Sequence, residues 1–438
     1  MLRNKIIIMS TRLALTGYKQ MRWFSTKQRM KVIDTVNELL SNNRLKHKQH
    51  PGILKPKQVE QPSWLADTVR QILHDRTISL QSISASSQKL AAHLYNRQPP
   101  PEKKDVRLKM KEVKTRLSQH ETQDSNNGDK FEDSEAKRLL KTLLYNWAPI
   151  QYDAYTSLAY LVKRSIEVKL LWEYKSNFTR AASKFWVNSI KEYYCVDISK
   201  DMHELSEYLI KRAIPQVKPI HIFYRQFFPA SPIPTYDIVV SAYSLLELPH
   251  QMSRLEIISK LWHKTERYLI IIEQGTNVGF RLVNEAREFI LNSKNAHDAH
   301  VFSPCPHDTL CPRYATDDTP CNFEITYLTL PIGGNSIYKR ECYSYVVLKK
   351  GNRPENDCKW PRIVREVLKR SKHVICRMCT SSGKLEEQIF TAWKDGKNTY
   401  RCARNSEWGD RLPFATEEVE EEEKVEQEGE IEKEKEHI

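Results

Sequence analysis

The chain has 438 residues, of which 40% are hydrophobic and 28% are charged, and its formal net charge is +14. This length allows two or three domains with sizeable cores. No run of 18 or more apolar residues occurs, so a transmembrane helix is not expected. The odd number of cysteines, nine, and the lack of a secretory signal argue against a secreted disulfide scaffold.

The first 30 residues contain no acidic side chain, and basic residues alternate there with Leu, Ile, Met, Ser and Thr. This acid-poor, basic amphipathic composition is typical of a mitochondrial transit peptide. Arg22-Trp23-Phe24-Ser25 resembles a matrix-protease cleavage site. We therefore expect residues 1–30 to direct the chain to the mitochondrial matrix; an ordinary basic arm is the alternative.

Residues 31–134 are expected to form a helical arm and a charged linker. Apolar spacing predicts one helix over residues 30–48, and Ser63-Trp64-Leu65 begins a second helical stretch. Pro99, Pro100 and Pro101 end the next helix. The polar segment 102–134 predicts a charged helix followed by a flexible linker.

The expected main domain, residues 135–300, alternates helical patterns at 135–166 and 201–213 with short apolar runs. These runs, 193–197, 236–242 and 268–273, read as strands buried on both faces, as in a parallel α/β sheet. Their order fits a class I methyltransferase-like (Rossmann-like) sheet. In that fold the acid that ends the second strand holds the ribose of S-adenosylmethionine. Asp197 has this place.

The turn that would bind this cofactor is missing its glycines. Such turns need glycine because the backbone passes close to the ligand, yet no glycine occurs between Gly128 and Gly275. The corresponding stretch, 170–179, carries aromatic and long side chains. We therefore expect no S-adenosylmethionine binding of the usual kind and no catalysis; an error in the gene model at residues 165–180 is the alternative.

Eight of the nine cysteines lie beyond residue 304, in an expected cysteine-rich metal-cluster and RNA-binding lobe at 301–415. Cys305, Cys311 and Cys321 lie in a proline-rich loop, which suits metal ligands. Cys376 and Cys379 have the two-residue spacing of zinc knuckles, but a second such pair is absent from the sequence. Spacing alone leaves zinc and iron–sulfur open, and a mitochondrial location favours iron–sulfur.

The remaining cysteines of the lobe are expected to be structural. Cys342 lies in the segment 338–348, whose alternating pattern predicts a strand, and Cys358 lies in a polar loop. His307 is a candidate ligand, although a histidine near cysteines more often supports the ligands or lies at the surface.

Charge is distributed unevenly along the chain, with an acidic C-terminal segment and a basic remainder. Residues 417–438 contain twelve Glu and three Lys, a net charge of −9, so the rest of the chain carries +23. A body this basic favours a polyanion such as RNA, with a solvated basic surface as the alternative. The tail, 416–438, is expected to be disordered.

Several stretches between His50 and Asp410 together resemble one family. They are Leu246-Glu247-Leu248-Pro249, Glu273-Gln274-Gly275-Thr276, Asn284-Glu285-Ala286-Arg287-Glu288, Cys305-Pro306-His307 with Cys311-Pro312, Trp360-Pro361-Arg362-Ile363, Val367-Leu368-Lys369-Arg370, and Tyr400-Arg401-Cys402-Ala403-Arg404 with Trp408-Gly409-Asp410. In them the chain resembles the methyltransferase-like protein 17 family, mitochondrial relatives of proteins that assemble the small ribosomal subunit.

The resemblance implies a matrix protein that binds rRNA on the maturing small subunit and supports mitochondrial translation. It implies a [4Fe–4S] cluster on Cys305, Cys311, Cys321 and Cys379, with Cys376 as the near alternative to the last. The family's Gly-x-Gly turn is absent here, which leaves the assembly role without methyl transfer. Expected partners are ribosomal proteins and rRNA, with no membrane and a monomer away from the ribosome.

In this reading the cluster folds the lobe, which presents basic and aromatic residues to rRNA. The basic residues are Lys369, Arg370, Lys372, Arg377, Arg401, Arg404 and Arg411, and the aromatic ones are Trp360, Tyr400 and Trp408. Two other readings stay open: an active rRNA or protein methyltransferase, with Asp197 in its cofactor site, and a zinc-stabilised RNA-binding module.

Overall fold

The computed structural model describes residues 29–54, 58–60, 63–120, 136–140, 144–145, 147–164, 192–213, 221–229, 231, 234–293, 299–316, 319–331 and 337–417. Several expectations lie outside the described residues. They concern the transit peptide up to residue 28, the flexible linker, the glycine-free turn at 170–179 and the acidic tail beyond Glu417.

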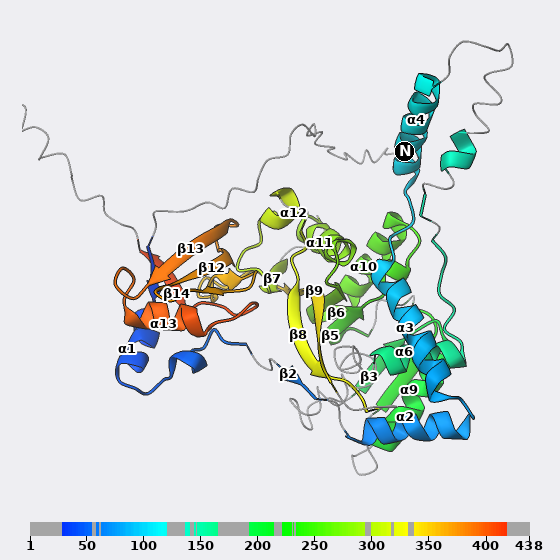
Figure 1. Ribbon diagram of the computed structural model, residues 1–438, viewed down its shortest axis with the longest axis horizontal. Helices are drawn as coiled ribbons and strands as arrows, with labels where there is room; N and C mark the ends of the chain where they lie inside the picture. The colour runs from blue at the N-terminus through cyan, green and yellow to red at the C-terminus, as the bar shows by residue number, and fades with distance from the viewer. Residues whose placement is uncertain are drawn as a thin grey trace, which may run out of the picture.

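A six-stranded mixed sheet forms the centre of the structure (Figure 1). Its strands run in the order β2-β8-β9-β6-β5, and β7 also pairs with β9. Their bounds are β2 Gln58–Val59, β5 Tyr236–Ala242, β6 Thr265–Gln274, β7 Ala299–Ser303, β8 Phe323–Leu328 and β9 Tyr338–Lys350. The strands expected at 236–242 and 268–273 are thereby confirmed.

Strand direction in this sheet differs in part from expectation. β5 and β6 are parallel, with Val239 opposite Leu269, but β9 runs antiparallel to β6, β7 and β8. Continuous apolar runs mark strands buried on both faces, and they do not distinguish a parallel neighbour from an antiparallel one. The fold is therefore mixed α/β.

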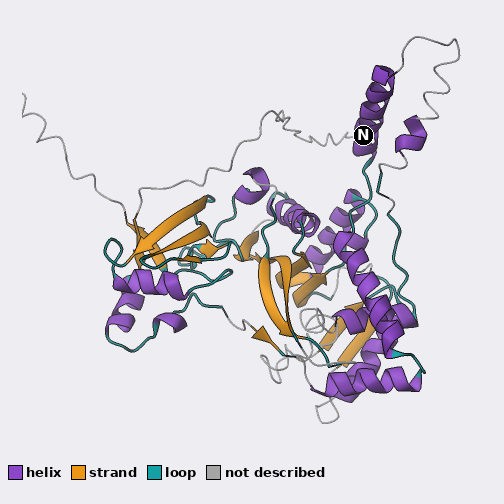
Figure 2. Cartoon of the chain, in the orientation of Figure 1, coloured by secondary structure: helices purple, strands orange, loops and turns teal. Residues whose placement is uncertain are grey.

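Two helices cover the central sheet with a shared apolar core (Figure 2). They are α10, Gln251–Lys264, and α11, Asn277–Leu291. The side chain of Thr276 caps α11 by accepting a hydrogen bond from the Gly279 amide at 3.2 Å. Residues spaced four apart, Leu282, Ala286 and Ile290, bury one face of α11 against the strands.

A separate two-stranded parallel sheet and four helices lie to one side of the central sheet (Figure 1). β3, Glu192–Val196, pairs with β4, His221–Arg225, and confirms the strand expected at 193–197. The helices α2, Ser63–Asp75, α3, Leu80–Asn96, α6, Ala154–Arg164, and α9, Lys200–Ala213, share one core. The helices expected from residue 63 and at 201–213 are confirmed, as is the charged helix, α4, Lys103–His120. Of the helical region expected at 135–166, the described residues are helical at 136–140 and in α6.

A C-terminal lobe stands beside the central sheet, at the left of Figure 1. Its antiparallel sheet joins β10, Arg362–Ile363, β11, Leu368–Lys369, β12, His373–Cys379, and β13, Leu385–Thr391. The helix α13, Lys397–Asn405, packs against β12 and β13. The short 3₁₀ turn η2, Leu245–Glu247, and α12, Pro312–Thr316, lie outside this lobe.

The first described residues belong to this lobe. β1, Arg29–Val32, pairs with β14, Phe414–Glu417, and is followed by α1, Asp34–Ser41, and a 3₁₀ turn, η1, His47–Gln49. The single helix expected over 30–48 is therefore wrong. Met30 and Val32 alternate as in a strand, and only Val36 and Leu40 follow a helical spacing into the lobe core.

Candidate metal centre

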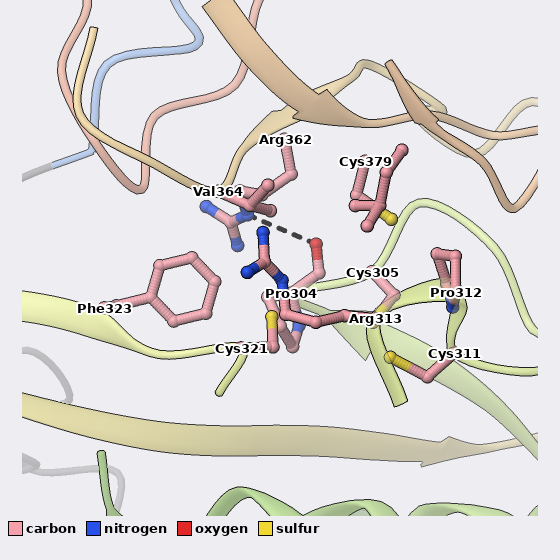
Figure 3. Close-up of a pocket in the computed structure, with 11 residues that line it drawn as sticks. Pro304, Cys305, Cys311, Pro312, Arg313, Cys321, Phe323, Arg362, Val364 and Cys379 are labelled. Atoms are coloured by element: carbon pink, nitrogen blue, oxygen red, sulfur yellow. Dashed lines mark hydrogen bonds between the residues drawn. The ribbon is translucent and has the colours of Figure 1, made fainter. Parts of the chain in front are cut away.

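Four cysteines, three from one loop and one from a distant strand, line one cavity between the central sheet and the lobe (Figure 3). They are the four for which the sequence resemblance implies cluster ligation. The cavity is lined by Pro304, Cys305, Cys311, Pro312, Arg313, Cys321, Phe323, Arg362, Val364, Cys379 and Leu385. Among the residues that the structure describes, no three Cys, His, Asp or Glu side chains form a group that could hold a metal ion.

Three of these cysteines come from the connection between β7 and β8. Cys305 follows β7 by two residues, Cys311 precedes α12 directly, and Cys321 lies two residues before β8. Cys379 is the last residue of β12, opposite Arg362 of β10. The cavity therefore joins a loop of the central sheet to the lobe.

The alternation of β12 separates the two cysteines that the sequence could not rank. Cys376 is fully buried with Val374 and Met378 in the core of the lobe. Cys379, three residues further along the strand, lies on the opposite face with Val364 and Leu385, where it lines the cavity. The structure brings Cys379, and not Cys376, to the other three.

A buried arginine holds the loop between Cys305 and Cys311. The Arg287 guanidinium, on α11, donates hydrogen bonds to the backbone oxygens of His307 at 3.2 Å and Thr309 at 2.7 Å. On the same loop, the Asp308 carboxylate accepts hydrogen bonds from the Val301 amide at 2.7 Å and from the Arg353 side chain at 2.8 and 2.9 Å. The loop is thus fixed to the central sheet.

A second arginine connects the two parts that meet at the cavity. Arg362, on β10 of the lobe, donates to the backbone oxygen of Pro304 at 3.2 Å and to the hydroxyl of Ser303 at 2.9 Å. Its remaining nitrogen donates to the backbone oxygen of Gly409 at 2.6 Å. The side chain is only 2% exposed. Arg362 therefore sets the position of Cys305 relative to the lobe.

His307 contacts a candidate ligand directly. Its Nε2 lies 3.2 Å from the Cys379 sulfur, and its Nδ1 lies 2.9 Å from the Thr309 hydroxyl. Burial, with the nearby Arg287 charge, lowers the pKa of His307 to about 4, so the imidazole is neutral at physiological pH. Gly383 makes room for this arrangement, because a Cβ there would lie 2.3 Å from the Thr309 hydroxyl oxygen.

Burial and mutual repulsion of the thiolate forms raise the pKa values of Cys305, Cys321 and Cys379. Burial, then the neighbouring Cys311, raises the pKa of Cys305 to about 11, although the Arg287 and Arg362 charges act in the other direction. Burial and the nearby Cys311 and Cys305 raise the pKa of Cys321 to about 12, and burial raises the pKa of Cys379 well above its usual value. Such thiols stay protonated until a bound cation replaces the proton.

The other cysteines beyond residue 304 do not line the cavity. Cys342 is half-buried in β9, Cys358 lies in a loop, and Cys402 is fully buried in the lobe core. Asp197 follows β3 directly, and its carboxylate accepts a hydrogen bond from the Ser199 amide at 3.0 Å. Glu273, buried near the end of β6, accepts one from the Leu245 amide at 2.9 Å.

Sequence reasoning overlooked the residues that support the cysteines. Arg287 and Arg362 stand in stretches that carry the family resemblance, but the sequence alone does not indicate that they are buried beside the ligands. The expected aromatic contacts are half-buried: Arg365 lies over the ring of Trp408, and Arg404 over that of Tyr400. Sequence reasoning also assigned no role to Trp393, a tryptophan in a polar turn. In the structure this residue is 95% exposed.

Comparison with known proteins assigns this chain to a family. The family model described as mitochondrial small ribosomal subunit Rsm22 matches residues 174–413, which include all four cavity cysteines. The chain belongs to this family. The human ribosome assembly protein METTL17, mitochondrial (Homo sapiens), is 33% identical over 400 residues, which cover 84% of this chain and 86% of that protein. The expected resemblance to the methyltransferase-like protein 17 family is thereby confirmed.

Two fungal relatives match shorter parts of the chain. The Rsm22-cox11 tandem protein 2, mitochondrial, of Schizosaccharomyces pombe is 33% identical over 221 residues, covering 41% of this chain and 29% of that protein. The ribosome assembly protein RSM22, mitochondrial, of Saccharomyces cerevisiae is 22% identical over 288 residues, covering 42% of this chain and 45% of that protein.

Proposed function

We propose that this protein is an assembly factor of the mitochondrial small ribosomal subunit, that it works in the matrix, and that a [4Fe–4S] cluster stabilises it. The family, with its human and yeast relatives named as mitochondrial ribosome assembly proteins, supports the assembly role. One observation carries the cluster: Cys305, Cys311, Cys321 and Cys379 line the same cavity.

The chemistry of the four donors suits such a cluster, although in the described structure no three of them form a group that could hold a single metal ion. All four donors are thiols, three come from a loop, and four cysteine thiolates are the usual ligands of a [4Fe–4S] cluster. Thiolates bring negative charge into a protein interior, and the buried cations Arg287, Arg313 and Arg362 lie close enough to offset it. When bound, the cluster would link the loop at 305–321 to β12. A single zinc ion on the same thiolates is the competing occupant.

The described strands also agree with a methyltransferase-like fold. β5 and β6 are parallel neighbours, β9 is antiparallel to β6, and Asp197 directly follows β3 of the parallel pair β3–β4. Binding of S-adenosylmethionine in that fold needs a glycine-rich turn, which the sequence does not contain. We therefore propose a role in assembly without methyl transfer. Calorimetry with S-adenosylmethionine tests this point, and heat of binding with methylation of rRNA would contradict it.

We further propose that the lobe binds rRNA. Lys369, Arg370 and Lys372 are exposed at the turn between β11 and β12, and Arg401 is exposed on α13. The Arg404 guanidinium donates to the backbone oxygen of Arg370 at 2.6 Å, which holds this turn against α13. Exposed cations on a fixed surface are suited to phosphate contacts, whose strength falls steeply with salt.

The direct test is co-sedimentation with the mitochondrial small subunit after replacing a cluster ligand. Cys305→Ser should lose both the visible absorption of the cluster and sedimentation with the subunit. Cys358→Ser, which changes a cysteine outside the cavity, is the matched control and should keep both. Co-sedimentation of a Cys305→Ser protein that lacks iron would show that binding to the small subunit does not depend on the cluster.

A further inference from the structure

We propose that Trp393 is a stacking platform for one unpaired RNA base, with the phosphates on either side held by neighbouring lysines and arginines. This inference rests on the proposed RNA binding and names the residue that contacts a base. Trp393 is 95% exposed, the highest value among the large hydrophobic residues that the structure describes. Single exposed apolar side chains are common, so the argument depends on what surrounds this one.

The ring stands on a turn that hydrogen bonds hold in place. The Asp395 carboxylate accepts from the Thr391 amide at 2.7 Å, and the Thr391 hydroxyl accepts from the Lys394 amide at 3.1 Å. The Asp395 amide donates back to the Thr391 backbone oxygen at 3.1 Å. Asp395 is itself only 7% exposed. Because the turn is already held in place, Trp393 would lose little conformational entropy when it binds a ligand.

Strand pairing brings a second turn to the same end of the sheet. His373, the first residue of β12, pairs with Thr391, the last residue of β13. The turn that carries Arg370 and Lys372 therefore lies next to the turn that carries Trp393. The hydrogen bond from Arg404 to the Arg370 backbone oxygen fixes α13 beside both turns.

The exposed charges on the two turns and on α13 are of one sign. Exposed cations on these turns and on the start of α13 are Lys369, Arg370, Lys372, Lys394, Lys397 and Arg401. No acidic residue occurs in the sequence from 368 to 375, and Asp395 is the single one from 391 to 405. Its carboxylate faces the Thr391 amide, inside the turn. An aromatic face amid cations suits a nucleobase with flanking phosphates better than an apolar pocket on a protein.

The test measures RNA affinity of the full-length protein by fluorescence anisotropy, with a labelled single-stranded oligoribonucleotide and with the corresponding duplex. Trp393→Ala should weaken single-strand binding roughly 5- to 150-fold and leave duplex binding almost unchanged. Trp393→Phe should restore most of the loss because it keeps an aromatic face. Met252→Ala, which removes a side chain that is 75% exposed on α10, is the control and should bind as the wild type does.

The lysines are tested through salt. Replacing Lys394 and Lys397 together by Ala should flatten the slope of log affinity against log salt by roughly 0.7 per lost phosphate contact, while Trp393→Ala should leave the slope unchanged. Equal single-strand affinity of Trp393→Ala and wild type would overturn the stacking site and leave RNA binding intact. Unchanged RNA affinity with lost binding to the small subunit would assign Trp393 to a protein partner instead. A wild type without RNA affinity would overturn RNA binding itself, and the stacking site with it.

Discussion

Replacing Cys379 and Cys376 separately by alanine compares two buried sulfurs on one strand. Cys379 is 8% exposed and Cys376 is fully buried, so each change removes a similar apolar contact at a cost of about 1 to 2 kcal/mol in folding free energy. Only Cys379 lines the cavity with the other three cysteines. The two variants should therefore differ in cluster content and be similar in packing.

The size of the difference follows from the link that the cluster would make. Cys321 and Cys379 stand 58 residues apart in the sequence, and closing a loop of that length in the unfolded chain is worth about 4 kcal/mol on the entropic model of crosslinks. Cys379→Ala should lose this stabilisation of the lobe in addition to the packing cost. Cys376→Ala should lose the packing cost alone.

The assay is anaerobic purification, followed by visible absorption, iron analysis and denaturant unfolding. Cys376→Ala should keep its colour and iron and should unfold at a slightly lower denaturant concentration. Cys379→Ala should be colourless, and its lobe should become sensitive to limited proteolysis. The reasoning would be refuted by a coloured Cys379→Ala protein, or by a colourless Cys376→Ala protein that is folded.

Three further changes test the surroundings of the cavity and the composition of the lobe. Arg287→Leu leaves two backbone oxygens of the cysteine loop without their donor, so iron content should fall, whereas Arg281→Leu, at an exposed position of the same helix, should keep it. Gly383→Ala should lower the melting temperature more than Gly396→Ala. Both glycines have positive φ, but only at Gly383 would a Cβ collide with the loop, so equal shifts would contradict the packing described. Leu40→Ala should cost about 2 to 5 kcal/mol and open the C-terminal lobe to protease, and a protease pattern unchanged from wild type would contradict the placement of α1 in that lobe.

The sequence was sufficient for the elements whose pattern is local. The strand at 236–242 has the bounds that its apolar run predicts, and the helix at 200–213 begins one residue before its predicted start. The choice between Cys376 and Cys379 needed the structure, because it depends on which face of β12 meets the cavity. Spacing along a chain cannot show that face until the neighbouring strands are placed.

Long-range contacts account for what the sequence did not predict. Residues 29–32 form a strand only because β14, nearly 400 residues later in the chain, offers a partner. Arg287 reaches the cysteine loop from a helix whose polar residues gave no sign of that contact. Trp393 was overlooked because exposure is a property of the folded chain, and a tryptophan in a sequence is equally consistent with a core.

The cluster is the central claim, and metal analysis of the native protein tests it most directly. Protein purified without oxygen should show a broad visible absorption band and should contain iron and acid-labile sulfide in equal amounts, both lost in Cys379→Ala. A colourless, folded wild-type protein that contains zinc and no sulfide would contradict the account, and would assign the four cysteines to a zinc site.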